Sequence, residues 1–167
     1  DVVGIISRAS GAPAIANALK FVADCAKNNV HGIYAEELKA AKKAGLDEKI
    51  EISSVAATQD EIGNDMYPPA KRKLEEMGIP YTRRVARLFT GADYEKYDVI
   101  IGMDEENRED LLHLTQGDPK KKLKQLMDFT DTPKEVADPW YTGNFNETYE
   151  DILRGTTGLL QALRKQM

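Results

Sequence analysis

The residues best suited to chemistry are Asp138 and the three that follow it, Pro139, Trp140 and Tyr141. The proline favours a turn, which gives the carboxylate a fixed starting point. Two large rings follow directly, and a carboxyl group that is partly removed from water holds its proton more readily. We therefore expect Asp138 to donate a proton in a reaction, whereas an Asp-Pro pair taken alone indicates only a turn.

A second candidate site is the loop of small residues that follows the apolar run Val2–Ile6. It consists of Ser7, Arg8, Ala9, Ser10, Gly11 and Ala12, and Pro13 then opens a helical pattern. Backbone N–H groups and the positive end of the helix dipole at such a place can hold an anion. The loop is thus a candidate phosphate-binding site, with the alternative that it only joins a strand to a helix.

These candidate groups need a scaffold, and the apolar pattern indicates one. Short apolar or alternating runs predict strands at Val2–Ile6, Lys49–Ser53, Asp98–Met103 and Leu123–Met127. Helical patterns lie between and after them, at residues 13–26, 34–44, 68–77, 90–97, 105–114 and 146–163. This alternation predicts an α/β fold with right-handed crossovers and a parallel sheet covered on both faces. Ligands of such sheets bind beyond the carboxyl ends of the strands, where we expect both candidate sites to meet.

Size and composition bound the possible functions. A chain of 167 residues suits a single domain spanning residues 1–167, and 41% hydrophobic with 31% charged residues is typical of a soluble protein. The net charge of −5 argues against a nucleic-acid partner, and no apolar run is long enough to cross a membrane. One cysteine excludes an internal disulfide and, with no visible secretory signal, favours the cytoplasm. The scattered histidines and Cys25 predict no metal site, and no cofactor is expected.

Six motifs, read in order, resemble the low-molecular-weight protein tyrosine phosphatases. They are Ala44-Gly45-Leu46, Glu61-Ile62-Gly63-Asn64, Tyr67-Pro68-Pro69-Ala70-Lys71-Arg72-Lys73-Leu74, Ile100-Ile101-Gly102-Met103-Asp104, Leu126-Met127-Asp128-Phe129 and Asp138-Pro139-Trp140-Tyr141. The resemblance runs from about residue 40 to the C-terminus. It implies one three-layer α/β domain, flavodoxin-like and of the phosphotyrosine phosphatase I type, with a four-stranded parallel sheet and helices on both faces.

The resemblance also implies a reaction and roles for residues. In that family a thiolate attacks phosphorus, an aspartic acid protonates the leaving phenol, and water then hydrolyses the phosphocysteine. The family's acid corresponds to Asp138, and its pocket aromatics correspond to Trp140 and Tyr141, with Tyr67 at the same rim. Phosphotyrosine in a protein, a small aryl phosphate or an inorganic phosphate-like anion is the implied partner, and no metal is required.

The N-terminal quarter departs from the family pattern. The family signature is a cysteine, five residues and then arginine, directly after the first strand. No Cys-x5-Arg occurs in this chain, because Cys25 is followed six positions later by His31. The phosphate loop is therefore degenerate by sequence.

Two alignments of this quarter are open. The first makes Cys25 the nucleophile and Leu19–Asp24 the first strand, which breaks a good amphipathic helix. The second makes Val2–Ile6 the first strand and Ser7–Pro13 the phosphate loop, with Cys25 buried in a helix and Arg8 as a source of a guanidinium. Helical periodicity favours the second.

The function expected on these grounds is hydrolysis of phosphotyrosine or aryl phosphate monoesters with Asp138 as general acid. The alternative is a phosphatase-like domain, natural or engineered, that binds an anion or a partner without turnover. The retained Asp138 motif favours the first, and the missing Cys-x5-Arg favours the second.

Overall fold

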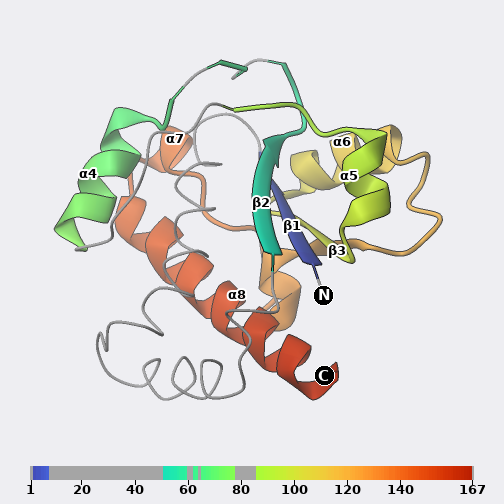
Figure 1. The fold of residues 1–167 in the computed structure, drawn as a ribbon. Coiled ribbons are helices and arrows are strands. Elements are labelled where there is room, and N and C mark those ends of the chain that lie inside the picture. Colours follow the sequence, from blue (N-terminus) through green and yellow to red (C-terminus); the bar gives the residue numbers. More distant parts are fainter. Residues whose placement is uncertain (1, 8–50, 60–61, 64, 78–85, 167) are drawn as a thin grey trace.

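The computed structural model describes residues 2–7, 51–59, 62–63, 65–77 and 86–166. Its centre is a parallel sheet of strands β1 (Val2–Ser7), β2 (Glu51–Ala56), β3 (Val99–Gly102) and β4 (Leu123–Gln125). The strand order is β2-β1-β3-β4, so β1 lies in the interior of the sheet (Figure 1). The register pairs Val2 with Glu51 and Ser7 with Ala56 on one side, and Gly4 with Ile100 on the other. The predicted four-stranded parallel sheet is confirmed.

Helices cover both faces of this sheet, as predicted. The side chains of Ile100 and Ile101 point to opposite faces because neighbouring residues of a strand alternate. Ile100 packs in one buried cluster with residues of α5 (Gly91–Lys96) and α6 (Glu105–Leu114). Ile101 packs in another with residues of the long helix α8 (Phe145–Gln166). The result is a three-layer domain, in which α8 crosses the face of the sheet opposite to α5 (Figure 1).

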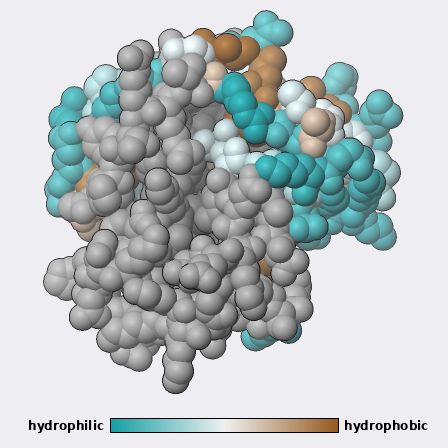
Figure 2. All heavy atoms as spheres, in the orientation of Figure 1, coloured by the Kyte–Doolittle hydropathy of each residue, from teal (hydrophilic) through white to brown (hydrophobic). Residues whose placement is uncertain are grey.

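A third buried cluster joins α4 (Pro68–Glu76) to the start of α8. Ala70 and Leu74 of α4 are buried there, with Phe145, Tyr149 and Leu153 of α8 packed against them. Pro68 and Pro69 begin α4, where a missing N–H costs nothing and the fixed φ suits the first turn. In the view of Figure 2, the described surface over α4 and α5 is predominantly hydrophilic.

Capping residues explain where two helices that cover the sheet begin. The side chain of Asp104 accepts a hydrogen bond from the Asn107 N–H at 2.6 Å, which caps α6 at its predicted start. Thr90 and Asp93 form a reciprocal capping box at α5. Both helices were predicted from sequence and both are confirmed.

The fourth strand is shorter than predicted. It ends at Gln125, and the 3₁₀ helix η1 (Leu126–Phe129) follows, in which Leu126 and Met127 are fully buried. Helix α8 lies so close to η1 that a Cβ built at Gly158 would stand 1.9 Å from the carbonyl oxygen of Phe129. Glycine at this position lets the two backbones touch.

The predicted helices at residues 13–26 and 34–44 lie outside the described residues. Within the described ranges, no helix is both long and apolar enough to cross a bilayer.

Candidate functional site

Segment 134–138 lies against the carboxyl end of β3. The Val136 N–H donates to the Met103 carbonyl at 2.9 Å, and the Val136 side chain is buried in the cluster that contains Met103. Asp138 follows two residues later. Asp138 therefore lies at the carboxyl edge of the sheet, where the sequence predicts that the candidate sites meet, and the other candidate site, apart from Ser7, lies outside the described residues.

Asp138 begins the short helix α7 (Pro139–Thr142). Its Oδ1 accepts a hydrogen bond from the Trp140 N–H at 2.7 Å, so the carboxylate is the N-cap of the helix. Gly143 ends the helix with φ of 66°, in the left-handed region that glycine adopts without strain. The carboxyl group is exposed to solvent, which leaves its second oxygen accessible to a substrate.

The expected shielding of Asp138 by the rings that follow it is wrong for the free protein. Trp140 is 60% exposed and Tyr141 is 82% exposed, so neither ring removes the carboxyl group from water. The Trp140 ring packs against Tyr67 instead. Asp138 itself is exposed.

Tyr67 lies beside Trp140, as the predicted rim requires. Their ring centroids are 5.4 Å apart at an interplanar angle of 54°, a favourable tilted arrangement. Tyr67 precedes α4, and its ring also lies 6.3 Å from that of Phe145 at the start of α8. The contact joins the segment before α4 to the helix that carries Trp140.

Two hollows flank the Asp138 helix. One, of about 520 Å³, is bounded by Tyr67 and Trp140, with Arg72 and Lys73 of α4 on its wall. The other, of about 650 Å³, includes Asp138 and Tyr141 and is lined chiefly by carboxylates, namely Asp104, Glu105, Glu106, Glu109, Glu135 and Glu147. Carboxylates dominate the second hollow, whereas the first also contains Glu76, which pairs with Lys73 at 2.8 Å.

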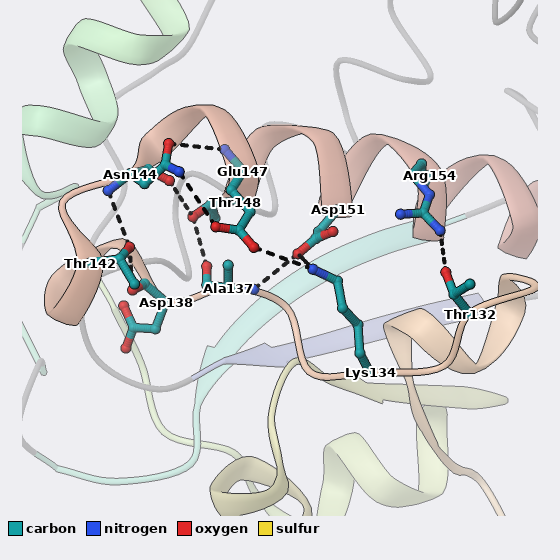
Figure 3. A network of polar contacts seen from close by, with 10 residues as sticks. All are labelled: Thr132, Lys134, Ala137, Asp138, Thr142, Asn144, Glu147, Thr148, Asp151 and Arg154. Atoms are coloured by element: carbon teal, nitrogen blue, oxygen red, sulfur yellow. Dashed lines mark hydrogen bonds and ion pairs between the residues drawn. The ribbon is translucent and has the colours of Figure 1, made fainter.

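Two side chains of α8 hold the backbone just before Asp138 (Figure 3). The Ala137 N–H donates to Asp151 Oδ2 at 3.2 Å, and the Ala137 carbonyl accepts from Thr148 Oγ1 at 2.7 Å. Asp151 is 2% exposed, and Lys134 Nζ contacts its Oδ2 at 2.7 Å. The hydrogen bond to Asp151 raises the pKa of Lys134, so this lysine stays charged and neutralises the buried carboxylate.

Sequence reasoning missed Thr148, Asp151 and Lys134. A signal was available, because Thr148 and Asp151 fall on the same stripe of α8 as the buried residues Ile152 and Leu159. A carboxylate on an apolar stripe needs a partner inside the protein.

The other predicted site residues fall largely outside the described part of the chain. Ser7 is the last residue of β1, at the carboxyl edge of the sheet and paired in register with Ala56. Arg8, Ala9, Ser10, Gly11, Ala12 and Cys25 lie outside the described residues. In the described ranges, no cluster of three or more His, Cys, Asp or Glu side chains is arranged to hold a metal.

A doubly wound sheet with a candidate acid at its carboxyl edge restricts the class of protein, and comparison with known proteins identifies the family. The sequence model for "Low molecular weight phosphotyrosine protein phosphatase" matches residues 19–167. The low molecular weight protein-tyrosine-phosphatase YfkJ of Bacillus subtilis is 32% identical over 128 residues, covering 75% of this chain and 82% of that protein. This chain therefore belongs to the low molecular weight phosphotyrosine protein phosphatase family.

The solved structures agree. The crystal structure of YfkJ superposes with a TM-score of 0.77 at 26% identity, covering 99% of this chain and 95% of that one. The resemblance read from the motifs and the flavodoxin-like fold are thus confirmed.

A third similarity is of another kind. A stretch of 43 residues, 26% of this chain, is 60% identical to the glycine/sarcosine/betaine reductase complex component C subunit alpha of Peptoclostridium acidaminophilum, of which it covers 11%. That protein is named as a component of a reductase complex and not as a phosphatase.

Each of the two alignments of the N-terminal quarter is supported by one finding, the first by the family match and the second by the sheet. The family match begins at residue 19 and so includes Cys25 while leaving Ser7–Ala12 outside. The sheet, in contrast, places Val2–Ser7 between β2 and β3, in the interior position that the second alignment gives to the first strand. An experiment on Cys25 separates them.

Proposed function

We propose that this protein hydrolyses phosphate monoesters of aryl alcohols, such as phosphotyrosine in a protein or a small aryl phosphate, with Asp138 as general acid. One observation carries the proposal: Asp138 presents an accessible carboxyl group at the carboxyl edge of the sheet, at the start of the short helix whose Trp140 ring packs against Tyr67. An aryl group lying against these rings would bring its phosphate ester oxygen toward the acid. It would also provide the shielding from water that the free protein lacks.

The nucleophile in this proposal is Cys25, the only thiol of the chain. Its thiolate forms a bond to phosphorus while the bond from phosphorus to the aryl oxygen breaks, and Asp138 gives its proton to that oxygen. Water then attacks the phosphocysteine, the phosphorus–sulfur bond breaks, and the Asp138 carboxylate takes a proton from the water. Phosphate leaves and the thiolate is restored, so the cycle consumes one water per ester and requires no metal.

The direct test is hydrolysis of p-nitrophenyl phosphate by Asp138→Asn. Asparagine is as good an N-cap as aspartate, so α7 is kept and only the proton is lost. We expect turnover to fall by about 10²- to 10⁴-fold, the usual contribution of a general acid. A matched control is Asp131→Asn, an exposed aspartate in the segment after η1, which should hydrolyse at the unmodified rate. Unchanged turnover in Asp138→Asn would remove this residue from the mechanism.

Cys25→Ser tests the nucleophile separately. A serine hydroxyl is far less acidic than a thiol, so turnover should be abolished if Cys25 attacks phosphorus. Retained turnover would eliminate the alignment through Cys25 and leave the loop Ser7–Ala12 as the site of phosphate binding. In that case Arg8→Ala should weaken vanadate binding, because a guanidinium is the side chain best suited to phosphoryl oxygens.

Anion binding without turnover is a second candidate function. The observation that favours it is the missing Cys-x5-Arg, since no arginine stands at the family position relative to the only thiol. Titration with vanadate distinguishes the two functions. Vanadate binding in a protein that releases no p-nitrophenol would favour this candidate, and measurable turnover would exclude it.

A further inference from the structure

Ala137, the residue immediately before the proposed acid, is held through both of its backbone polar groups. Its N–H donates to Asp151 and its carbonyl accepts from Thr148, and both partners belong to α8 (Figure 3). The preceding residue is fixed as well, because the Val136 N–H donates to Met103 at the end of β3. The acid loop is therefore tied to the sheet and to α8 at successive residues.

The tie is buried, whereas the acid itself is exposed. Thr148 is 9% exposed and Asp151 is 2% exposed. In the described part of the chain, the Asp138 side chain is held only by the hydrogen bond from Trp140, two residues away on the same short helix. Nothing in that local bond fixes the loop against the sheet, so the position of the carboxyl group depends on the backbone at Ala137.

We propose that Thr148 and Asp151 are positioning residues for the general acid, because they fix Ala137 and so place the Asp138 carboxyl group at the carboxyl edge of the sheet. The inference rests on the proposed function, since it assigns these residues to the same reaction. Lys134 completes the arrangement by contacting the buried carboxylate of Asp151 at 2.7 Å and Glu147 at 3.6 Å. A shift of about 1 Å in a reacting group can cost on the order of 10²-fold in rate, so a loosened loop has a measurable effect.

A positioning role and a merely structural role predict different substrate dependence. Phenol is a poorer leaving group than p-nitrophenol, because the nitro group stabilises the phenolate. Proton donation therefore matters more for phenyl phosphate than for p-nitrophenyl phosphate. A variant that misplaces the acid should lose more kcat/KM on phenyl phosphate, whereas a variant that only lowers the folded fraction should lose the same factor on both substrates.

The experiment compares Thr148→Val with Thr148→Ser. Valine keeps the shape of threonine and removes the hydroxyl that donates to Ala137, while serine keeps the hydroxyl. We expect Thr148→Val to lose about 10-fold in kcat/KM on phenyl phosphate and about 2-fold on p-nitrophenyl phosphate. Thr148→Ser should restore the ratio of the two values to that of the unmodified protein. Equal losses on both substrates, or no rescue by serine, would overturn the proposal.

Thr157→Val is a matched control on the same helix. The Thr157 hydroxyl bonds only within α8 in the described structure, to the Leu153 carbonyl at 2.7 Å, and does not contact the acid loop. Both substrates should keep their unmodified kcat/KM in this variant. A selective loss on phenyl phosphate here would show that any hydroxyl deletion in α8 has the same effect, and would count against the proposal.

Trp140 supplies a readout that does not depend on turnover. It is the single tryptophan of the chain and lies two residues after Asp138. Loosening of the loop in Thr148→Val or Asp151→Asn should lower the fluorescence anisotropy of Trp140 and increase its quenching by acrylamide. Unchanged anisotropy of Trp140 in both variants would contradict the proposal that Thr148 and Asp151 fix the acid loop. A variant that folds poorly is measured at low temperature, where it is folded.

Asp138→Asn, measured on the same two substrates, separates failure of this inference from failure of the proposed function. If Asp138→Asn shows the larger loss on phenyl phosphate and Thr148→Val does not, only the positioning role is wrong. If Asp138→Asn shows equal losses, or the unmodified protein has no turnover, the proposed function fails and the positioning role fails with it.

Discussion

Asp93 and Asp138 both lie at the start of a helix, and of these two only Asp138 is available for chemistry. Asp93, in the first turn of α5, accepts hydrogen bonds from the Thr90 N–H and hydroxyl at 2.9 and 2.8 Å. It also accepts both arms of the Arg87 guanidinium at 2.9 and 2.8 Å, a bidentate pair. In the described part of the chain, the side chain of Asp138, at the start of α7, accepts one hydrogen bond, from the Trp140 N–H at 2.7 Å, and is exposed.

The difference shows how the surroundings of an aspartate determine whether it serves stability or catalysis. The hydrogen bond from Arg87, with those from Thr90, lowers the pKa of Asp93 and keeps it ionised, so it stabilises the fold and has no proton to give. Asp138 keeps one oxygen accessible and is placed by its backbone. A carboxylate that serves structure is surrounded by donors, and one that serves catalysis must leave room for the substrate.

The largest expected effect is on turnover and contrasts the same substitution at the two sites. Asp138→Asn should slow hydrolysis of p-nitrophenyl phosphate by about 10²- to 10⁴-fold, because the proton donor is lost. Asp93→Asn should leave kcat/KM of the folded protein unchanged, because Asp93 is on the opposite side of the sheet from α8. Steady-state kinetics at one pH, with the folded fraction measured by circular dichroism, compares them. A loss of turnover in folded Asp93→Asn would contradict the claim that Asp93 serves only stability.

The next effect is on stability, where substitution of Asp93 should have a larger effect than substitution of Asp138. Asp93→Ala removes a bidentate ion pair and a capping box, and should lower the free energy of unfolding by about 2–3 kcal/mol. Asp138→Ala removes one exposed N-cap bond and should cost about 0.5–1 kcal/mol. Urea denaturation followed by circular dichroism measures both. Equal costs at the two positions would show that the surrounding donors of Asp93 contribute little.

Sequence alone could locate the scaffold of this comparison but not all of its contacts. The helix at Glu105–Leu114 was predicted because its helical pattern is local in sequence, and the structure adds Asp104 as its cap. The end of β4 was misplaced because Leu126 and Met127 are apolar in either a strand or a buried turn. In the structure Asp128 caps the turn by accepting from the Gln125 N–H at 3.0 Å, and η1 packs against α8 far along the chain, with Leu126 against Gly155 and Phe129 against Gly158.

Sequence likewise predicted some features of the candidate site and missed others. Alternating strands and helices were enough to place Asp138 at the carboxyl edge, because parallel strands bring their ends together. The partners that hold its loop, Thr148 and Asp151, were missed because they are joined to Ala137 only by the packing of α8. Whether a ring covers Asp138 was also beyond sequence, since it depends on packing such as that of Trp140 against Tyr67.

A smaller effect follows from the pH dependence of Asp93. Because its folded-state pKa is lowered, its contribution to stability is fully present above the ordinary aspartate value of about 3.9 and is lost as pH falls through the lower folded value. The stability difference between the unmodified protein and Asp93→Asn should therefore be constant from neutral pH down to about pH 5 and shrink below about pH 4. Urea denaturation over this range measures it. A difference that stayed constant to the lowest pH would mean that the charge of Asp93 contributes nothing.

The smallest effect tests whether the shape of the Asp93 pair matters beyond its charge. Arg87→Lys keeps the positive charge but cannot make two parallel bonds to one carboxylate, because an ammonium group lacks the planar fork. Arg87 is about half exposed, with 48% of its side-chain surface accessible, so solvent screens the charge and leaves geometry as the main difference. The free energy of unfolding should fall by about 0.5–1 kcal/mol with no change in turnover. An Arg87→Lys protein as stable as the unmodified one would show that the second parallel bond contributes nothing, and the contrast with the singly bonded Asp138 would then rest on charge and burial instead of on the number of donors.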